Sequence, residues 1–441
     1  MQQNYIKRRI DSELLSWKLA PNRKPLLLRG ARQVGKSSSV RQLGRHFEFF
    51  AEVNLDEKRS FREVFARDMT PRQICDELSV LCNIPIVPGR TLLFFDEIQS
   101  CPAAISALRY FYEQMPELHL VAAGSLLEFA LRELPSFGVG RVRSLFMFPF
   151  SFDEYLRATG ENLLADALKN ASPEHPFSDA VHQKCIRQFV RFIFIGGMPE
   201  VVAAYAQNNS LTDCRRILDD LLISIFDDFA KYKARVPAPR LREVLASVMR
   251  QIGNKFVYNR ASETSNHTQI KECVDLLEMA GLIHPVTHTS GNGLPLAAEQ
   301  NTKFRKYLIF DTGVFQRFLN LDASEIFDED TLGQINKGAL ADLFAGLELL
   351  KTAAAGNPAQ LFYWQREERG SNAEVDYLVQ RGADVVPVEI KSGRRGAMQS
   401  LHLFLSEKKS PYGVRCSLEN FGLLPNVLIY PLYAAGHIPQ F

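Results

Sequence analysis

Eight residues near the N-terminus have the spacing of a loop that binds phosphate. Residues 30–37 read Gly-Ala-Arg-Gln-Val-Gly-Lys-Ser, which fits the pattern GxxxxGK[ST]. In such a loop, backbone amides can surround phosphate oxygens at the N-terminus of the next helix. Lys36 would reach the β and γ phosphates, and Ser37 would bind Mg²⁺. The predicted nucleotide-binding residues are Gly30, Ala31, Arg32, Gln33, Val34, Gly35, Lys36, Ser37 and Ser38.

An acidic pair is predicted to complete this site. Residues 91–95 read Thr-Leu-Leu-Phe-Phe, which is typical of a strand buried on both faces, and Asp96 and Glu97 follow directly. Asp96 is placed to hold Mg²⁺ through water, and Glu97 to orient and deprotonate the attacking water. The pair could instead cap the helix that starts near Ile98. Because the phosphate loop is present, hydrolysis is the favoured interpretation.

Two further polar residues are candidates for the same chemistry. Ser125 follows Gly124 after the apolar run 118–123 and is a candidate sensor that hydrogen-bonds the water or the γ phosphate. A helix N-cap explains Ser125 equally well. Arg141 follows Gly138-Val139-Gly140 and is a candidate arginine finger, which would act on the nucleotide of its own chain or, in a ring, on that of a neighbour. An exposed arginine that only contacts solvent is the alternative, and the oligomeric state stays open.

A second set of charged residues lies near the C-terminus. Residues 374–380 and 385–391 are predicted to pair as a hairpin. Strand periodicity places Glu389 and Lys391 on one face, with Asp376 on the paired strand. Two carboxylates across a hairpin could bind Mg²⁺ or Mn²⁺, and Lys391 could orient the hydrolytic water. The alternatives are an ion pair of Lys391 with Glu389 or Asp376, and a fold retained without activity.

The first 150 residues must position the phosphate loop and the acidic pair. Short apolar runs alternate there with helical patterns, which predicts an α/β domain with a parallel sheet. One strand is expected between the phosphate-loop strand and the acidic strand, as in the ATPase subclass with an inserted central strand. The predicted strands are residues 25–29, 49–55, 91–95, 118–123 and 141–150, and a helix is predicted over residues 34–45.

The rest of the chain is predicted to form three further segments. Residues 151–235 are mostly helical in pattern. In residues 236–330, two amphipathic helices are followed by two strands, which is typical of a winged helix. Its short middle helix is hard to find in residues 256–266. Residues 331–441 are predicted to form a small α/β unit.

Positive charge is clustered at the start of the winged-helix pattern. Residues 231–260 contain eight basic residues and one acidic residue, a local net charge of +7 (8 − 1). Such a cluster can bind the phosphates of DNA. The second helix of the pattern, residues 268–280, is more acidic than basic on its polar face, which is unfavourable in a major groove. DNA is therefore a predicted partner, and a solvated surface used in domain packing is the alternative.

Length and composition limit the class of protein. The chain has 441 residues, of which 46% are hydrophobic and 23% charged, and the charges nearly cancel (52 − 50 = +2). These values exclude a disordered chain, a collagen-like repeat and a disulfide scaffold. The seven cysteines have no CxxC spacing, so neither disulfides nor a zinc site is predicted and a reducing compartment fits. With no signal peptide and no apolar run of about 18 residues, we expect a cytoplasmic protein without a membrane span.

Taken together, the motifs resemble those of a family of bacterial and archaeal ATPases of the AAA superfamily, which carry a C-terminal domain of unknown function with a restriction-endonuclease-like fold. The resemblance implies an ATPase domain at residues 1–150, a helical lid at 151–235, a winged helix at 236–330 and a nuclease-like domain at 331–441. It rests on GARQVGKS (30–37), LLFFDEIQ (92–99), GS (124–125), GR (140–141), PFSFDEY (149–155) and GGMPEVV (196–202).

The C-terminal carboxylates resemble the core of PD-(D/E)xK nucleases. Asp376, Glu389 and Lys391 match its positions, although Val375 stands where many such cores have proline. The family pattern also has an acidic residue in a Gly-Ala-Leu-x-Glu run. Here residues 338–342 end in Asp342, so this shorter side chain is the fourth implied metal ligand.

Two functions follow from these patterns. The first is an ATP hydrolase that couples Mg-ATP hydrolysis to the action of the winged-helix and nuclease-like domains on DNA. The second is a nucleotide-dependent switch or scaffold, in which an inactive nuclease-like domain makes protein contacts. The acidic face of residues 268–280 favours the second.

Overall fold

The computed structural model describes most of the chain, which divides into two compact units. The first unit combines Met1–Pro149 with Met279–Gly281 and Ala354–Pro358, and the second contains the remainder. The domain boundaries at residues 150, 235 and 330 stay predictions. The described residues are 5–67, 69–125, 127–128, 131, 140–232, 235–320, 338–353, 355–356, 360–368, 370–393 and 396–438.

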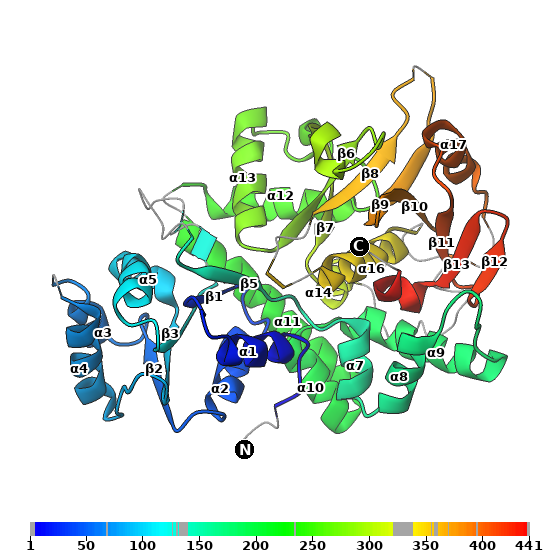
Figure 1. Ribbon diagram of the computed structural model, residues 1–441. Helices are drawn as coiled ribbons and strands as arrows, with labels where there is room; N and C mark the ends of the chain where they lie inside the picture. The colour runs from blue at the N-terminus through cyan, green and yellow to red at the C-terminus, as the bar shows by residue number, and fades with distance from the viewer. Residues whose placement is uncertain are drawn as a thin grey trace. The chain divides into compact units, whose positions relative to one another are not determined.

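The first unit is built on a five-stranded parallel sheet (Figure 1). The strand order is β2-β3-β4-β1-β5, and every neighbouring pair is parallel. The α/β fold with a parallel sheet is therefore confirmed, with β4 as the inserted strand between β1 and β3. The strands are β1 (Leu26–Arg29), β2 (Phe49–Asn54), β3 (Thr91–Asp96), β4 (His119–Ala123) and β5 (Arg143–Phe146).

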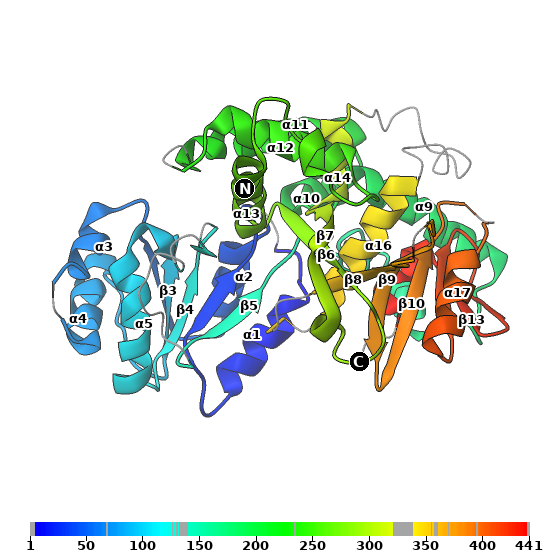
Figure 2. The same cartoon turned by 90° about the horizontal axis from the view of Figure 1, so that it is seen from above.

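Helices cover both faces of this sheet, with α3, α4 and α5 on one face and α1 and α2 on the other (Figure 2). Alternate strand residues such as Leu27, Val53 and Phe95 point into one core with α3, α4 and α5, as strand periodicity requires. The helices are α1 (Ile10–Leu19), α2 (Lys36–Gly44), α3 (Arg59–Val64), α4 (Pro71–Cys82) and α5 (Pro102–Gln114).

The second unit begins with a helical region. Residues 151–235 contain α7 to α11, so the predicted helical content is confirmed there. Phe189 on α9 packs edge-on against Phe344, at 4.8 Å between ring centroids, which ties these helices to α16 (Ala339–Thr352). The others are α7 (Phe152–Ala158), α8 (Asn162–Asn170), α9 (Asp179–Ile195), α10 (Pro199–Asn208), α11 (Leu211–Asp228), α12 (Ala238–Arg250), α13 (His267–Met279) and α14 (Thr312–Phe318).

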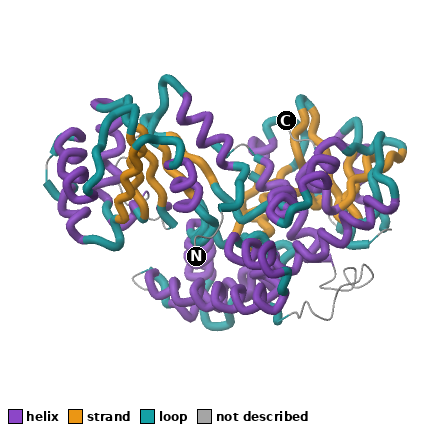
Figure 3. The backbone as a smooth tube through the Cα atoms, turned by 90° about the horizontal axis from the view of Figure 1, so that it is seen from below, coloured by secondary structure: helices purple, strands orange, loops and turns teal. Residues whose placement is uncertain are grey.

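An eight-stranded mixed sheet forms the rest of this unit, where the strands are orange and the helices purple in Figure 3. Its order is β12-β13-β11-β10-β9-β8-β6-β7. In Figure 2, α16 and α17 (Gln399–Lys408) lie on opposite faces of β8, β9 and β10. The strands are β6 (Ile283–Thr289), β7 (Gln300–Ile309), β8 (Leu361–Gln365), β9 (Glu374–Arg381), β10 (Asp384–Ile390), β11 (Gly413–Ser417), β12 (Gly422–Leu424) and β13 (Val427–Pro431).

The strands predicted for the winged helix and for the nuclease-like domain belong to one sheet. β6 and β7 pair antiparallel, but β6 also pairs in parallel with β8, where Val286 lies opposite Leu361. Where a winged helix has its short middle helix, the structure has a single 3₁₀ turn, Tyr258–Arg260. Periodicity predicts that a segment is a strand, but it does not say which strand pairs with it, so this joint sheet was not predicted.

Some element ends differ from the prediction. α2 begins at Lys36 rather than at residue 34, because Gly35 is its N-cap in a left-handed conformation. β5 ends at Phe146, before the predicted residue 150. No helix in the described ranges is long and apolar enough to cross a membrane. Three positions used in the sequence analysis lie outside the described residues: Gly138, Val139 and Lys233, one of the basic residues of the stretch 231–260.

Candidate nucleotide site and carboxylate cluster

The predicted phosphate loop connects β1 to α2 in the first unit. Gly30 has φ +143° and Gly35 has φ +97°, backbone angles that other residues rarely adopt. A Cβ atom at Gly30 would lie 2.2 Å from the carbonyl oxygen of Met147. The fold therefore requires glycine at both positions, which are the two fixed glycines of the motif.

Lys36 is the first residue of α2 and is buried. Its Nζ donates hydrogen bonds to the carbonyl oxygens of Gly30 (2.9 Å) and Ala31 (2.7 Å). Burial lowers the pKa of Lys36 to about 8, although the nearby carboxylates of Glu97 and Asp96 oppose this shift. The hydrogen-bond partners of the ammonium are neutral carbonyls, so its charge can still attract an anion.

The structure brings the two predicted Mg²⁺ ligands together. The Ser37 hydroxyl donates to Oδ2 of Asp96 at 2.8 Å, because β3 ends beside the start of α2. The other carboxylate oxygen, Oδ1, accepts the backbone N–H of Glu97 at 3.0 Å. Burial raises the pKa of Asp96. A hydroxyl and a carboxylate in contact are oxygen donors of the kind that Mg²⁺ takes, so these residues fit the ion.

Glu97 is held by two neutral donors. Its backbone is left-handed, with φ +49°. The side-chain amide of Gln99 donates to Oε2 of Glu97 at 2.5 Å, and the Ser125 hydroxyl donates to the same oxygen at 3.4 Å. A Cβ at Gly124 would lie 2.0 Å from Oε1 of Gln99, so glycine there leaves room for the amide. The sequence analysis quoted Gln99 in its motif but gave it no role.

Arg8 supports the phosphate loop and was not predicted from the sequence. Its guanidinium donates to the carbonyl oxygens of Val34 (3.0 Å) and Phe148 (2.8 Å), and its backbone N–H donates to Asp11 (2.8 Å). Arg8 thereby joins the loop to the segment after β5. A single arginine in a polar N-terminal stretch carries no pattern that would single it out.

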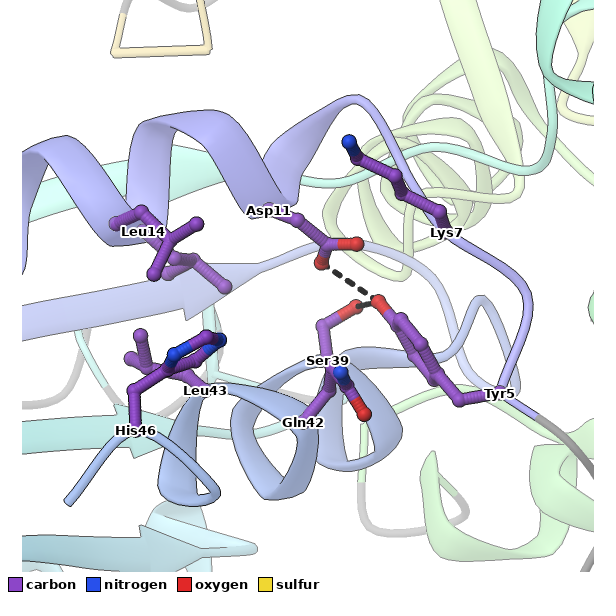
Figure 4. Close-up of a pocket in the computed structure, with 9 residues that line it drawn as sticks. Tyr5, Lys7, Asp11, Leu14, Ser39, Gln42, Leu43 and His46 are labelled. Carbon is purple, nitrogen blue, oxygen red and sulfur yellow. Dashed lines mark hydrogen bonds between the residues drawn. The ribbon is translucent and has the colours of Figure 1, made fainter.

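A hollow of about 310 Å³ lies beside α2 (Figure 4). At its polar end, the Tyr5 hydroxyl donates to Oδ1 of Asp11 at 2.6 Å and lies 3.0 Å from Oγ of Ser39. Burial and the Asp11 carboxylate raise the pKa of Tyr5. These bonds hold the N-terminal segment against α2. The hollow is lined by Tyr5, Lys7, Asp11, Leu14, Leu15, Ser39, Gln42, Leu43 and His46.

Arg141 lies beside the end of α5. Its Nε is 3.2 Å from Oε1 of Glu113, and Arg109 also pairs with that carboxylate. The arginine-finger role of Arg141 stays a prediction.

Part of the basic stretch takes part in packing within the second unit. The guanidinium of Arg242 lies over the ring of Phe226, 5.2 Å from its centroid, and Nζ of Lys255 lies 3.4 Å from the ring centroid of Phe304. Glu278, on the predicted recognition helix α13, pairs with Arg305 at 3.3 Å. These contacts agree with the packing alternative for this stretch.

The predicted C-terminal residues meet at one end of β9 and β10, beside α16. Asp342 is in the first turn of α16, and Oδ2 of Asp376 accepts the backbone N–H of Ile390 at 2.8 Å. Nζ of Lys391 donates to Oε1 of Glu389 at 2.7 Å, which is the ion pair given above as an alternative. We call Asp342, Glu374, Asp376 and Glu389 the carboxylate cluster.

Two carboxyl groups of the carboxylate cluster are buried without full hydrogen bonding. Oδ1 of Asp342 and Oε2 of Glu389 are buried, and neither has a hydrogen-bond partner among the residues that the structure describes. Burial raises the pKa of both groups to about 7, and the negative charge of Asp376 adds to the shift. Both side chains thus hold protons more readily than ordinary carboxyl groups.

Lys306 on β7 enters the carboxylate cluster, and the sequence analysis did not identify it. It forms ion pairs with Glu374 and, at 3.9 Å, with Asp376, and its side chain is only 3% exposed. The two acidic groups raise the pKa of Lys306, against the effect of burial. A lysine next to the apolar run 307–310 is the one sequence signal that could have pointed to it.

The carboxylate cluster does not fit the divalent metal that the nuclease resemblance implies. Among the described residues, no group of three or more His, Cys, Asp or Glu side chains is arranged to hold a metal ion. The positive charge within the carboxylate cluster comes from Lys306 and Lys391.

The first unit defines a class of protein by its sheet and its loop. A phosphate loop after β1, an acidic residue at the end of β3 and a strand between them are the features of a P-loop nucleotide hydrolase. Residues 22–156 match the family model of an AAA domain. This match supports a P-loop domain of the AAA ATPase type in the first unit, as the resemblance implied.

The second unit matches two families without a known function. Residues 186–325 match a domain of unknown function (DUF8612), and residues 337–434 match another (DUF4143). No curated protein matches the chain.

Two solved structures to which this chain is similar are a protein of Pyrococcus abyssi and a protein of Aeropyrum pernix. The Walker-type ATPase PABY2304 of Pyrococcus abyssi is 15% identical over 72% of this chain and 97% of its own, with a TM-score of 0.47. The ORC1 protein of Aeropyrum pernix in complex with DNA is 14% identical over 72% of this chain and 95% of its own, with a TM-score of 0.30. Both TM-scores are below 0.5, so neither structure assigns a function to this chain.

Proposed function

We propose that the first unit binds Mg-ATP and hydrolyses it, with Glu97 as the general base. The observation that carries this proposal is the contact of Ser37 with Asp96 at 2.8 Å beside the buried Lys36. It joins the phosphate-binding and metal-binding halves of one site. A bound Mg²⁺ would neutralise charge on the phosphate oxygens.

Each of these side chains has a separate task. The Lys36 ammonium exchanges the carbonyls of Gly30 and Ala31 for phosphate oxygens and stabilises the negative charge that develops on them. Glu97 accepts a proton from the attacking water at a carboxylate oxygen. Gln99 and Ser125 hold that carboxylate in place. Arg141 would act on the nucleotide of its own chain or, in a ring, on that of a neighbouring chain.

For the second unit, we propose a nucleotide-dependent switch with an inactive nuclease-like domain in preference to a nuclease. The ion pairs of Lys306 and Lys391 within the carboxylate cluster support this choice. A lid formed by residues 151–235 and a winged-helix-like segment at 236–330 would carry the change of state. In the competing function the second unit acts on DNA through the basic stretch.

ATP binding and hydrolysis by three variants test the proposal. Lys36→Ala abolishes ATP binding, because it removes the ammonium that meets the phosphates. Glu97→Gln still binds ATP, but its kcat falls roughly 10²- to 10⁴-fold, the usual contribution of a general base. Glu389→Gln is the matched control in the carboxylate cluster and leaves kcat unchanged. Failure of the wild-type protein to bind ATP with Mg²⁺ would contradict the proposal.

The same assay with duplex DNA separates the two functions of the second unit. A switch that does not act on DNA hydrolyses ATP at the same rate with or without duplex. Strong stimulation by DNA, lost in Lys36→Ala, supports action on DNA instead. Cleavage of a plasmid with Mg²⁺ or Mn²⁺ by the wild type, but not by Lys391→Ala, would establish a nuclease.

A further inference from the structure

Lys306 comes from a distant strand of the sheet that contains the carboxylate cluster. It belongs to β7, the edge strand, and β6 and β8 separate β7 from β9. Its side chain extends from β7 toward β9, because its Nζ lies 5.0 Å from the ring centroid of Tyr363 on β8. It ends in ion pairs with Glu374 and Asp376 on β9.

The ammonium of Lys306 is fixed where it is. Its side chain is 3% exposed and therefore almost completely removed from water, and opposite charges nearby stabilise a charge in such a place. Those charges are the carboxylates of Glu374 and Asp376. A second lysine, Lys391, meets Glu389 at 2.7 Å. Two fixed positive charges therefore face the four acidic side chains of the carboxylate cluster.

Asp376, the central carboxylate of the predicted metal site, has one oxygen hydrogen-bonded to the backbone and the other near the ammonium of Lys306. Oδ2 accepts the backbone N–H of Ile390 at 2.8 Å, and Oδ1 lies 3.9 Å from Nζ of Lys306. Mg²⁺ demands near-octahedral oxygen coordination at about 2.0–2.1 Å. A divalent ion at Asp376 would face the ammonium of Lys306 at close range.

We propose that the Lys306 ammonium is the resident cation of the carboxylate cluster and that it excludes a divalent metal ion. The ion pairs then connect β7 to β9 across two intervening strands. The carboxylates therefore resemble those of PD-(D/E)xK nucleases, but Lys306 supplies the positive charge that a metal ion supplies in those enzymes. The unit therefore does not hydrolyse phosphodiesters with Mg²⁺ or Mn²⁺.

Mn²⁺ binding to the full chain without nucleotide tests this inference. In electron paramagnetic resonance titrations, the wild type and Lys306→Arg bind no Mn²⁺ at the carboxylate cluster, because each keeps a cation there. Lys306→Met binds one additional Mn²⁺ per chain, and Mn²⁺ raises its thermal unfolding midpoint. The double variant Lys306→Met, Asp376→Asn loses that ion. Because Ser37 and Asp96 are unchanged in all four proteins, any background from the nucleotide site is the same.

Two results would overturn the inference. One is Mn²⁺ bound to the wild type and lost in Asp376→Asn. The other is a folded Lys306→Met protein that binds no additional ion. Should Lys306→Met fail to fold, the wild type alone decides the question through reductive methylation of its lysines. The Lys306 amine stays unmodified with or without millimolar Mn²⁺, whereas an entering metal ion would displace the amine and make it reactive.

Discussion

Lys36 in the first unit and Lys306 in the second are both buried lysines close to two acidic residues, yet their hydrogen-bond partners differ. Nζ of Lys36 donates to two backbone carbonyls, and burial lowers its pKa to about 8. Lys306 pairs with the carboxylates of Glu374 and Asp376, which raise its pKa. Carbonyl dipoles hold a lysine in place and leave its charge available, whereas carboxylates neutralise it. The charge of Lys36 can therefore bind an anion, whereas the charge of Lys306 is already neutralised by carboxylates of the same protein.

Replacing each lysine by methionine tests this comparison most strongly. Lys306→Met lowers the free energy of unfolding of the second unit by about 1.5–3 kcal/mol, because the half-buried carboxylates of Glu374 and Asp376 lose the cation that pairs with them. Lys36→Met changes the stability of the first unit by less than about 1 kcal/mol, because losing two hydrogen bonds to carbonyls is offset by removing a buried charge.

The two tryptophans allow each unit to be followed by itself in urea. Trp17 and Trp364 are both buried, Trp17 in the first unit and Trp364 in the second. In a Trp364→Phe background fluorescence reports on the first unit, and in a Trp17→Phe background it reports on the second. Equal losses of stability in Lys36→Met and Lys306→Met would contradict the claim that the two buried lysines differ in how their charge is stabilised.

His119 is a third buried basic side chain, and it shows what happens when no carboxylate offsets the effect of burial on the pKa. His119 on β4 lies between the rings of Trp17 and Phe47, at 5.7 and 4.7 Å between centroids. Burial lowers its pKa to about 4, and the positive charges of Arg23 and Lys18 add to this shift. In the part of the chain that the structure describes, no acidic group contributes to this shift. The native protein therefore keeps His119 neutral.

This makes the first unit less stable in acid. A histidine in the unfolded chain has a pKa of about 6.5. Between about pH 6.5 and 4, His119 is therefore protonated in the unfolded chain but neutral in the native chain. The free energy of unfolding consequently falls as the pH decreases through this window, by at most about 3 kcal/mol for the shift to pKa 4. Urea unfolding of the first unit at several pH values measures the slope, and His119→Gln reduces it. An unchanged slope in that variant would assign the acid sensitivity to other groups.

Most of the nucleotide site could be predicted from the sequence because its parts are local. Gly30, Gly35 and Lys36 lie within eight residues, and Asp96 ends an apolar strand. Parallel strands end at the same edge of a sheet, so the loop after β1 and the acid after β3 had to lie close together. The position of β4 between β1 and β3 was predicted from the same pattern, whereas the positions of β2 and β5 in the sheet were not.

The missed residues make contacts over long separations in the sequence. Arg8 bonds to Phe148, 140 residues away, and Lys306 to Glu374, 68 residues away. No spacing rule connects such pairs. The pairing of β6 with β8 was missed for the same reason, since a strand pattern specifies faces and not neighbours. By contrast, Glu389 and Lys391 are two residues apart, and their ion pair could be stated in advance as an alternative.

The acidic residues Glu97, in the nucleotide site, and Glu389, in the carboxylate cluster, also differ in their hydrogen-bond partners. This difference predicts the smallest effect, a change in kcat. Glu97 is held by neutral donors, Gln99 at 2.5 Å and Ser125 at 3.4 Å, whereas Glu389 is held by Lys391. A neutral donor orients a carboxylate without removing its ability to take a proton. Because a hydrogen bond to a charged group contributes about 1.5–3 kcal/mol and the Ser125 bond is long, Gln99→Ala lowers kcat roughly tenfold and Ser125→Ala about twofold.

Steady-state kinetics separates these positioning roles from contact with the nucleotide. If both residues act only through Glu97, kcat falls in each variant while KM for ATP stays unchanged, and neither variant lowers kcat further in a Glu97→Gln background. A larger loss in Ser125→Ala than in Gln99→Ala, with a raised KM, would instead show that Ser125 contacts the γ phosphate as a sensor. The hydrogen bond from Ser125 to Glu97 would then exist only without nucleotide, because Ser125 would turn to the γ phosphate when ATP binds. Gln99 alone would position the general base.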